Sequence, residues 1–155
     1  MHVTLQLVLQ AATLATVVVG FSSLISTINN YRRQMNAQIL MKYTERYEHI
    51  LSQFPPDALT ARFDSKFLPA ESTQLTLCVL KYLNLCSEEH YLRKHGYLSE
   101  SLWCIWEGDL KRIIGSALLQ REWSSLRKEF ESHPDFLEYV ERIQADHRFE
   151  NSKHT

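Results

Sequence analysis

The first 31 residues contain no Asp, Glu, Lys or Arg, and no other feature of the sequence constrains the fold as strongly. Residues 3–28 are predominantly apolar. At about 1.5 Å per helical residue, such a stretch crosses the roughly 30 Å hydrocarbon layer of a bilayer. We therefore predict a transmembrane helix at about Leu5–Thr27, within an anchor of residues 1–30. A cleaved signal peptide is the alternative, but it typically has Lys or Arg before a shorter apolar core.

The charges that flank this stretch predict its orientation. Arg32 and Arg33, followed by Lys42 and Arg46, lie on its C-terminal side, and no Lys or Arg precedes it. Positively charged flanks stay in the cytoplasm. We therefore predict a single-pass protein of the inner (plasma) membrane, with its N-terminus outside and its C-terminal part in the cytoplasm. The lipid bilayer is then one partner of the chain.

A stripe of small residues runs along the predicted transmembrane helix. Ala12, Thr16 and Gly20 recur at four-residue spacing. In a membrane, such a stripe lets two helix backbones approach closely. Self-association through this stripe is therefore one hypothesis for how the protein acts.

The rest of the chain predicts helices and no sheet. Apolar residues recur at spacings of three and four, as in amphipathic helices, and no stretch alternates apolar and polar residues between turn signals. We expect an all-α fold with one N-terminal transmembrane helix. It is followed by a juxtamembrane amphipathic helix (31–54), a small cytoplasmic helical bundle of about five helices (55–148) and a frayed polar tail (149–155).

The boundaries of the five helices follow from caps and breakers. Gly96 is expected to end one of them in the left-handed conformation. The expected helices are a short one capped by Asp57, three at about 71–95, 99–114 and 119–130, and a last one opened by Ser132.

Charge and glycine content exclude several functional classes. The net charge is −1, and the basic residues of the later helices alternate with Asp109, Glu122 and Glu129, which is typical of a solvated face. We therefore predict no nucleic-acid partner. The four glycines form no phosphate-binding loop, and no GxSxG motif occurs. The sequence predicts no cofactor and no catalytic residue, and it favours a non-enzymatic role while leaving enzymatic activity open.

The cysteines and histidines predict no disulfide framework and no metal site. Cys78, Cys86 and Cys104 are odd in number and lie among apolar residues, which favours buried free thiols in a reducing compartment. His90 and His95 are five residues apart and lie on different sides of a helix, whereas a zinc pair on a helix needs a spacing of three or four.

Two adjacent glutamates raise the possibility of a functional site. Glu89 lies on the apolar line of its helix and points toward the core, whereas Glu88 shares a lateral face with Asn84. The two carboxylates therefore diverge and do not form a general acid–base pair. A buried carboxylate requires a partner, and we expect Arg93, four residues on, an indole N–H or a helix N-terminus near Ser99 to supply it.

The following helix adds two tryptophans to this region. Trp103 and Trp106 lie on its apolar stripe, where aromatic residues usually belong to the core and sometimes bind a ligand or partner. With Asn84, Glu88 and Glu89 they make up the candidate binding residues. The competing interpretation is that Glu89 only clamps the helices together.

The same region carries a resemblance to known proteins. It resembles the central motif of a group of uncharacterised bacterial membrane proteins with one N-terminal span and a small helical cytoplasmic domain. The matching residues are Asn84 to Glu89, Tyr91, Leu92, Gly96, Tyr97, Trp103, Trp106 and Gly108. The resemblance covers about residues 40–140 in general pattern. It implies an anchored helical architecture but no reaction, ligand or catalytic residue.

Three functional hypotheses follow. The first is a membrane-anchored cytoplasmic interaction or regulatory module that binds a protein partner. The second is a small-ligand sensor or enzyme with a pocket around Glu89. The third is a membrane effector that self-associates through the small-residue stripe. A solvent-reaching cavity beside Glu89 would favour the second hypothesis.

Overall fold

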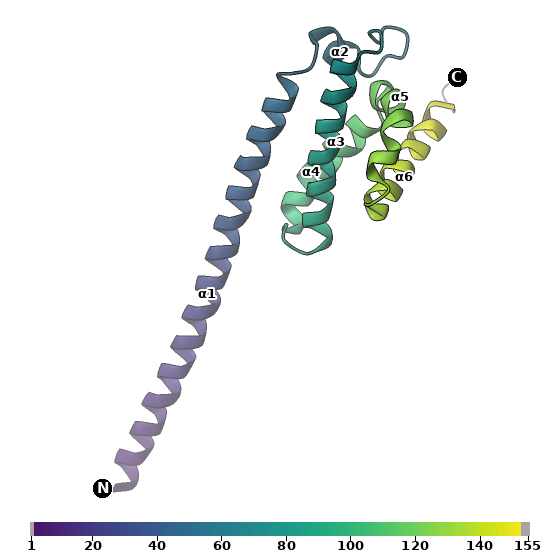
Figure 1. The fold of residues 1–155 in the computed structure, drawn as a ribbon. Helices are drawn as coiled ribbons and strands as arrows, with labels where there is room; N and C mark the ends of the chain where they lie inside the picture. The colour runs from purple at the N-terminus through teal and green to yellow at the C-terminus, as the bar shows by residue number, and fades with distance from the viewer. Residues whose placement is uncertain (1, 153–155) are drawn as a thin grey trace. The chain divides into compact units, whose positions relative to one another are not determined.

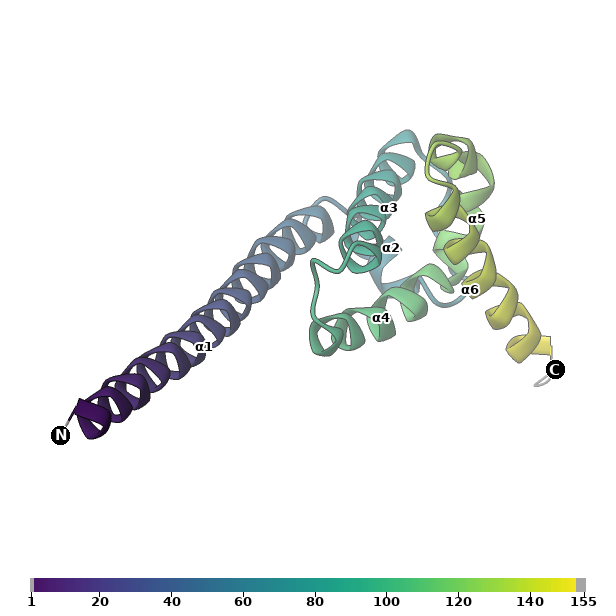
Figure 2. The same ribbon diagram turned by 90° about the horizontal axis from the view of Figure 1, so that it is seen from below.

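The computed structural model describes residues 2–152, and within them it is all-α (Figures 1 and 2). This confirms the predicted all-α class and the five helices expected after residue 54, and the segment predicted as a juxtamembrane helix (31–54) continues the N-terminal helix without a break. The helices are α1 (His2–Leu51), α2 (Pro56–Ala61), α3 (Thr73–Lys94), α4 (Glu100–Ile114), α5 (Ala117–Leu126) and α6 (Pro134–Ser152), with a short 3-10 helix, η1 (Arg127–Phe130), after α5.

The N-terminal helix α1 is long and apolar enough to span a membrane, a property that N-terminal signal sequences share. Its hydroxyl groups find partners within the helix. Thr13, Thr16, Ser22 and Thr27 each donate a hydrogen bond of 2.9 Å to the carbonyl oxygen four residues earlier. A hydroxyl satisfied in this way enters hydrocarbon at a lower cost than one without a partner.

The end of α1 differs from the prediction. The helix ends at Leu51 rather than Phe54. The amides of Gln53 and Phe54 donate to the carbonyls of Ile50 and Leu51, so the backbone tightens to bonds between residues three apart. The physical reason is the Pro55-Pro56 pair, because the residue before a proline is disfavoured in the helical region.

Serine side chains cap three of the later helices. Ser72, Ser99 and Ser116 each accept a hydrogen bond from the amide three residues on. Gly96 has φ +73°, and the amides of Gly96 and Tyr97 donate to the carbonyls of Arg93 and Leu92. These two bonds form a Schellman motif, which confirms the predicted left-handed stop.

Three predicted helix ends are wrong. Asp57 lies inside the first turn of α2, because Pro56 already occupies the first helical position. The last helix begins at Pro134 for the same reason, so Ser132 precedes it and its hydroxyl lies 3.0 Å from the His133 ring instead. Of the tail expected to fray (149–155), residues 149–152 continue α6, and residues 153–155 lie outside the part of the chain that the structure describes.

The chain divides into two compact units, with the boundary between Ile39 and Leu40. The second unit contains the hydrophobic core, in which α3 and α4 each pack against both α5 and α6 (Figures 1 and 2). Large side chains with less than 2% exposure fill this core. They include Leu75, Leu83, Leu85, Ile114, Leu118, Phe130 and Phe136.

Two residues are placed differently from their sequence-based prediction. Cys104 is exposed, whereas Cys78 and Cys86 are buried as expected, because Cys104 lies on the outer side of α4. Glu122 is only 3% exposed and does not belong to a solvated face. The Thr76 hydroxyl and the Arg121 guanidinium both donate hydrogen bonds to its carboxylate, and these bonds allow it to be buried.

Replacing Gly108 or Gly115 by alanine is expected to change the stability of the protein in opposite directions. A Cβ at Gly115 would overlap the imidazole ring of His147, whereas a Cβ at Gly108 would meet nothing within 4 Å. We expect Gly115→Ala to cost about 1–3 kcal/mol, as overpacking does. Gly108→Ala should instead stabilise α4 by about 1 kcal/mol. Urea unfolding of the full chain, followed by tryptophan fluorescence, measures both, and equal effects would contradict the packing of α6 against Gly115.

Candidate functional site

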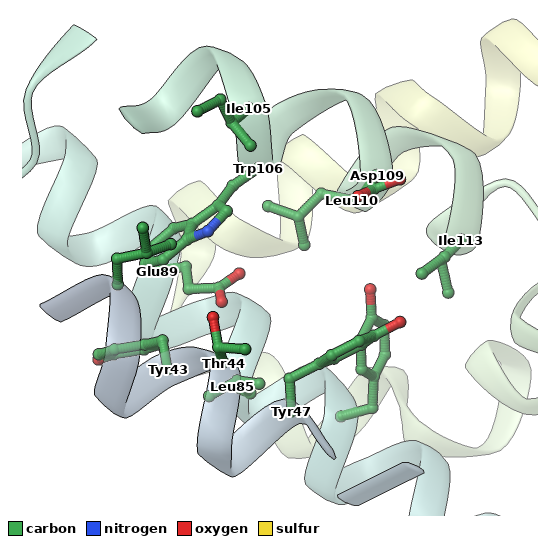
Figure 3. A pocket seen from close by; sticks show the side chains of 12 residues that line it. Tyr43, Thr44, Tyr47, Leu85, Glu89, Ile105, Trp106, Asp109, Leu110 and Ile113 are labelled. Atoms are coloured by element: carbon green, nitrogen blue, oxygen red, sulfur yellow. The ribbon is translucent and has the colours of Figure 1, made fainter. Parts of the chain in front are cut away.

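A cavity of about 240 Å³ lies between the last turns of α1, α3 and α4 (Figure 3). All of its lining residues belong to the second unit. They are Leu40, Tyr43, Thr44 and Tyr47 from α1, Tyr82, Leu85 and Glu89 from α3, and Ile105, Trp106, Asp109, Leu110 and Ile113 from α4.

Helical periodicity brings these side chains to one place. On each helix the lining residues are mostly three or four positions apart, so they share one face. The face of α1 that the sequence predicts as an apolar stripe thus forms one wall, and those of α3 and α4 form the others. Aromatic rings from all three helices line the cavity between these faces.

Glu89 is the buried carboxyl group of this cavity. Its side chain is 8% exposed, and its carboxyl group points into the space between Trp106 and Thr44 (Figure 3). Within residues 2–152 no hydrogen bond or ion pair reaches this carboxyl group. Burial raises the pKa of Glu89 to about 8, Arg46 opposes the rise, and Glu88 adds to it. Glu89 is therefore mainly protonated at pH 7.

The partner predicted for Glu89 is wrong. Arg93 forms an ion pair of 2.5 Å with Glu100 instead. Both of these side chains are more than a third exposed, so the pair forms at the surface. Arg93 thus contacts Glu100 on α4 instead of Glu89 on its own helix. The Glu89 carboxyl group therefore faces the cavity.

Glu88 has the opposite environment, although it is the next residue. Its two carboxylate oxygens accept hydrogen bonds of 2.5 and 2.8 Å from the Arg46 guanidinium, and one accepts a further bond of 3.2 Å from the Tyr43 hydroxyl. The bonds from Arg46 lower the pKa of Glu88. The two carboxylates diverge as predicted, and Glu88 joins α1 to α3 as a charged surface contact.

Aromatic rings form much of the cavity wall. The Tyr43 and Trp106 ring centroids are 5.5 Å apart, and those of Tyr47 and Tyr82 are 6.1 Å apart. Burial raises the pKa of Tyr43 to about 12 and raises the pKa values of Tyr47 and Tyr82. At neutral pH these phenols are uncharged, so the wall offers ring faces and hydroxyl groups.

The structure places the five candidate binding residues in different environments, and two of them line the cavity. Glu89 and Trp106 line the cavity, and Trp106 is only partly buried rather than part of the core. Trp103 is buried and packs against Tyr139, with ring centroids 6.4 Å apart. Asn84 is exposed and lines a separate surface depression. Glu88 makes the contact with Arg46 described above.

The wall that α1 contributes was not predicted from the sequence. Tyr43, Thr44 and Tyr47 line the cavity, but the segment 31–54 was predicted only as an amphipathic helix. The sequence carried one signal of a polar site here. Positions 43 and 47 hold Tyr rather than Leu or Ile, and a phenol hydroxyl on a buried face needs a polar neighbour.

The cavity wall has no basic side chain that would hold an anion. Its ionisable side chains are carboxyls and phenols, without Lys, Arg or His. Across the side chains described in the structure, no cluster of three or more His, Cys, Asp or Glu residues is suited to hold a metal ion. The arrangement suits binding of a small molecule that carries a hydrogen-bond donor or a positive charge.

Comparison of the chain with models of known protein families, with curated proteins and with solved structures finds no match. The resemblance to bacterial single-span membrane proteins therefore stays a prediction. The same holds for self-association through Ala12, Thr16 and Gly20. Within the single chain, a Cβ added at Gly20 would meet nothing within 4 Å.

Proposed function

We propose that this protein is a membrane-anchored, cytoplasmic regulatory module that binds a small organic ligand in the cavity beside Glu89. The anchor is the apolar N-terminal part of α1, which crosses the inner membrane with its N-terminus outside. The ligand contacts α1 as well as α3 and α4, so its binding alters how the last turns of α1 pack on the helical domain. A protein partner that recognises this packing would receive the signal.

One observation carries this proposal: a buried carboxyl group without a protein partner lines an open cavity. A side chain whose only role was to clamp helices would have a hydrogen-bond partner, because an unpaired buried carboxyl costs several kcal/mol. Glu88 makes that kind of contact, and Glu89 does not. Perturbed ionisable groups in concave sites are typical of binding and catalytic positions. This favours ligand binding over a purely protein-docking role.

The test is to block the cavity and ask what the protein loses. Thr44 lies on the cavity wall, so Thr44→Phe places a ring in the cavity without changing any carboxyl group. Glu48→Phe is the matched control, because Glu48 is exposed, lies one turn further along α1 and is not a lining residue. The full chain is purified from its native cells in lipid nanodiscs, and small molecules extracted from it are identified by mass spectrometry.

We expect a small molecule at near-stoichiometric amounts with the wild type and with Glu48→Phe. Thr44→Phe should reduce it at least tenfold. Equal recovery from all three proteins would show that the extracted molecule does not occupy the cavity. Recovery of no small molecule from the wild type would count against the proposed function.

The exposed thiol provides a test of the proposed topology. Cys104 is exposed and Cys78 and Cys86 are buried, so native protein should react with a maleimide at one position. We expect a membrane-impermeant maleimide to leave intact spheroplasts unlabelled and to label one thiol per chain after the membrane is opened. Cys104→Ser should abolish this labelling. Labelling of Cys104 in intact spheroplasts would place the domain outside.

A further inference from the structure

We infer that the ligand is a small organic amine, with its ammonium group against Glu89 and its apolar body against the aromatic wall. This inference rests on the proposed function, because it names the chemical class that the cavity receives.

The first argument is charge. Glu89 and Asp109 are the carboxyls of the cavity wall, and no lining side chain is basic. Arg46 is the cation that acts on the pKa of Glu89, and both of its terminal nitrogens are hydrogen-bonded to Glu88. A cation that enters the cavity therefore meets an uncompensated carboxyl group, whereas an anion would meet two carboxyls and no counter-charge. Once Glu89 is ionised, the low effective dielectric of the cavity strengthens this preference for a cation.

The second argument is the aromatic wall. Tyr43 and Trp106 lie beside Glu89, and Tyr47 lies further along the same cavity (Figure 3). A cation over the face of such a ring is attracted by the negative charge of the ring face, and Trp is the most favourable ring. Rings together with a carboxyl group favour an ammonium ion over a neutral molecule of the same shape. The cavity of about 240 Å³ has room for about eight waters at roughly 30 Å³ each, and so suits a small organic molecule of similar size.

Binding of an amine is coupled to a proton. An organic ammonium ion is already protonated at pH 7, as lysine is, so the bound pair requires Glu89 to ionise. The O–H bond of the Glu89 carboxyl group breaks, its proton goes to water, and the carboxylate accepts hydrogen bonds from the ammonium N–H groups. Only the ionised fraction of Glu89 can bind the ammonium ion. As the pH increases toward the pKa of about 8, the affinity for the amine should therefore rise about tenfold per pH unit.

The cavity tyrosines and Glu88 do not titrate over the same range as Glu89. The tyrosines have raised pKa values, and the pKa of Glu88 is lowered. The groups that face or influence Glu89 are Tyr43, Arg46 and Tyr47 on α1, Glu88, Tyr82 and Cys86 on α3, Asp109 on α4 and Tyr139 on α6.

The experiment compares three probes of one shape and different charge. They are 2-phenylethylamine (cationic), 2-phenylethanol (neutral) and 3-phenylpropanoate (anionic). Each is titrated calorimetrically into the full chain in nanodiscs of zwitterionic phosphatidylcholine, at pH 6, 7 and 8. The proteins are the wild type, Glu89→Gln, Thr44→Phe and the Glu48→Phe control.

We expect the amine to bind the wild type and Glu48→Phe at least tenfold more tightly than the alcohol or the acid. Its affinity should rise about tenfold from pH 6 to 7, with release of close to one proton at pH 7. Glu89→Gln should lower its affinity at least tenfold and remove the pH dependence, and Thr44→Phe should abolish binding of the amine.

Two results would overturn the inference. If the alcohol or the acid binds as tightly as the amine, and Thr44→Phe blocks that binding, the cavity is a ligand site but the amine class is wrong. If none of the probes binds the wild type, the amine class is also wrong. The extraction experiment on native protein then decides the proposed function by itself.

Discussion

Glu89→Gln is expected to stabilise the folded protein by about 2–3 kcal/mol at pH 7. Burial raises the pKa of Glu89 from near 4.5 to about 8, so at pH 7 the unfolded chain gains free energy by ionising and the folded chain does not. The difference, 7 − 4.5 = 2.5 pH units, corresponds to about 3 kcal/mol at 1.36 kcal/mol per unit. Glutamine has nearly the same shape and cannot ionise, so it removes this cost and leaves only an uncharged polar group to bury.

The pH dependence has a definite sign. The folded pKa lies above the unfolded one, so the folded state holds the extra proton between about pH 4.5 and 8. The contribution of Glu89 to stability is therefore fully present below pH 4.5 and falls as the pH rises to 8. Glu89→Gln should flatten this part of the stability profile.

The measurement is urea unfolding of the full chain in nanodiscs at pH 5, 6, 7 and 8. Tryptophan fluorescence reports the helical domain, because Trp103, Trp106 and Trp123 all lie in it. Glu88→Gln is the matched control. The lowered pKa of Glu88 means that its stabilising contribution is present at pH 5 to 8, so this variant should lose stability and keep the pH slope of the wild type. A Glu89→Gln protein less stable than wild type at pH 8 would mean that Glu89 has a partner that the structure lacks.

The stability effect bears on the proposed function. In binding and active sites, function often conflicts with stability, so a residue there makes the protein less stable than Gln or Leu would at the same position. The same variant is expected to lose affinity for the amine. Increased stability together with lost binding cannot be explained by unfolding, so the two results together separate a binding role from a structural one.

Arg121→Ala is expected to destabilise the protein by about 3 kcal/mol. Its guanidinium donates hydrogen bonds of 3.1 and 2.8 Å to the buried Glu122 carboxylate and one of 2.7 Å to the Pro69 carbonyl, which holds the loop before α3. Removing one partner of a buried pair leaves an uncompensated charge and typically costs about 3–5 kcal/mol. We take the lower end because the Arg121 side chain is 24% exposed.

The control is an ion pair of similar length at the surface. Arg127 and Glu141 are 2.7 Å apart, with side chains 48% and 44% exposed. Arg127→Ala should cost less than about 1 kcal/mol. The double variant Arg121→Ala with Glu122→Gln should recover part of the loss, because the buried charge is then gone. Denaturant unfolding of the four proteins measures these differences, and similar costs for the two single variants would contradict the burial of Glu122.

Local patterns predicted most of the helices and part of the candidate site. The spacing of apolar residues indicated the faces of α3 and α4, and it separated Glu89 from Glu88 correctly. Glu122 was misplaced because charge alternation along α5 is the same whether a helix face meets water or another helix. Arg93 was assigned to the wrong partner because an i, i+4 rule considers one helix at a time.

The sequence by itself determined the apolar N-terminal helix, the all-α class and the left-handed stop at Gly96. These depend on hydrocarbon length, helical period and the φ that a single residue can adopt, and all three are local properties. Only the tertiary structure decided that Arg46 pairs with Glu88, that Glu89 has no partner and that Tyr43 and Trp106 stand beside it. These contacts join residues on different helices, and the packing of bulky side chains there determines where a cavity remains.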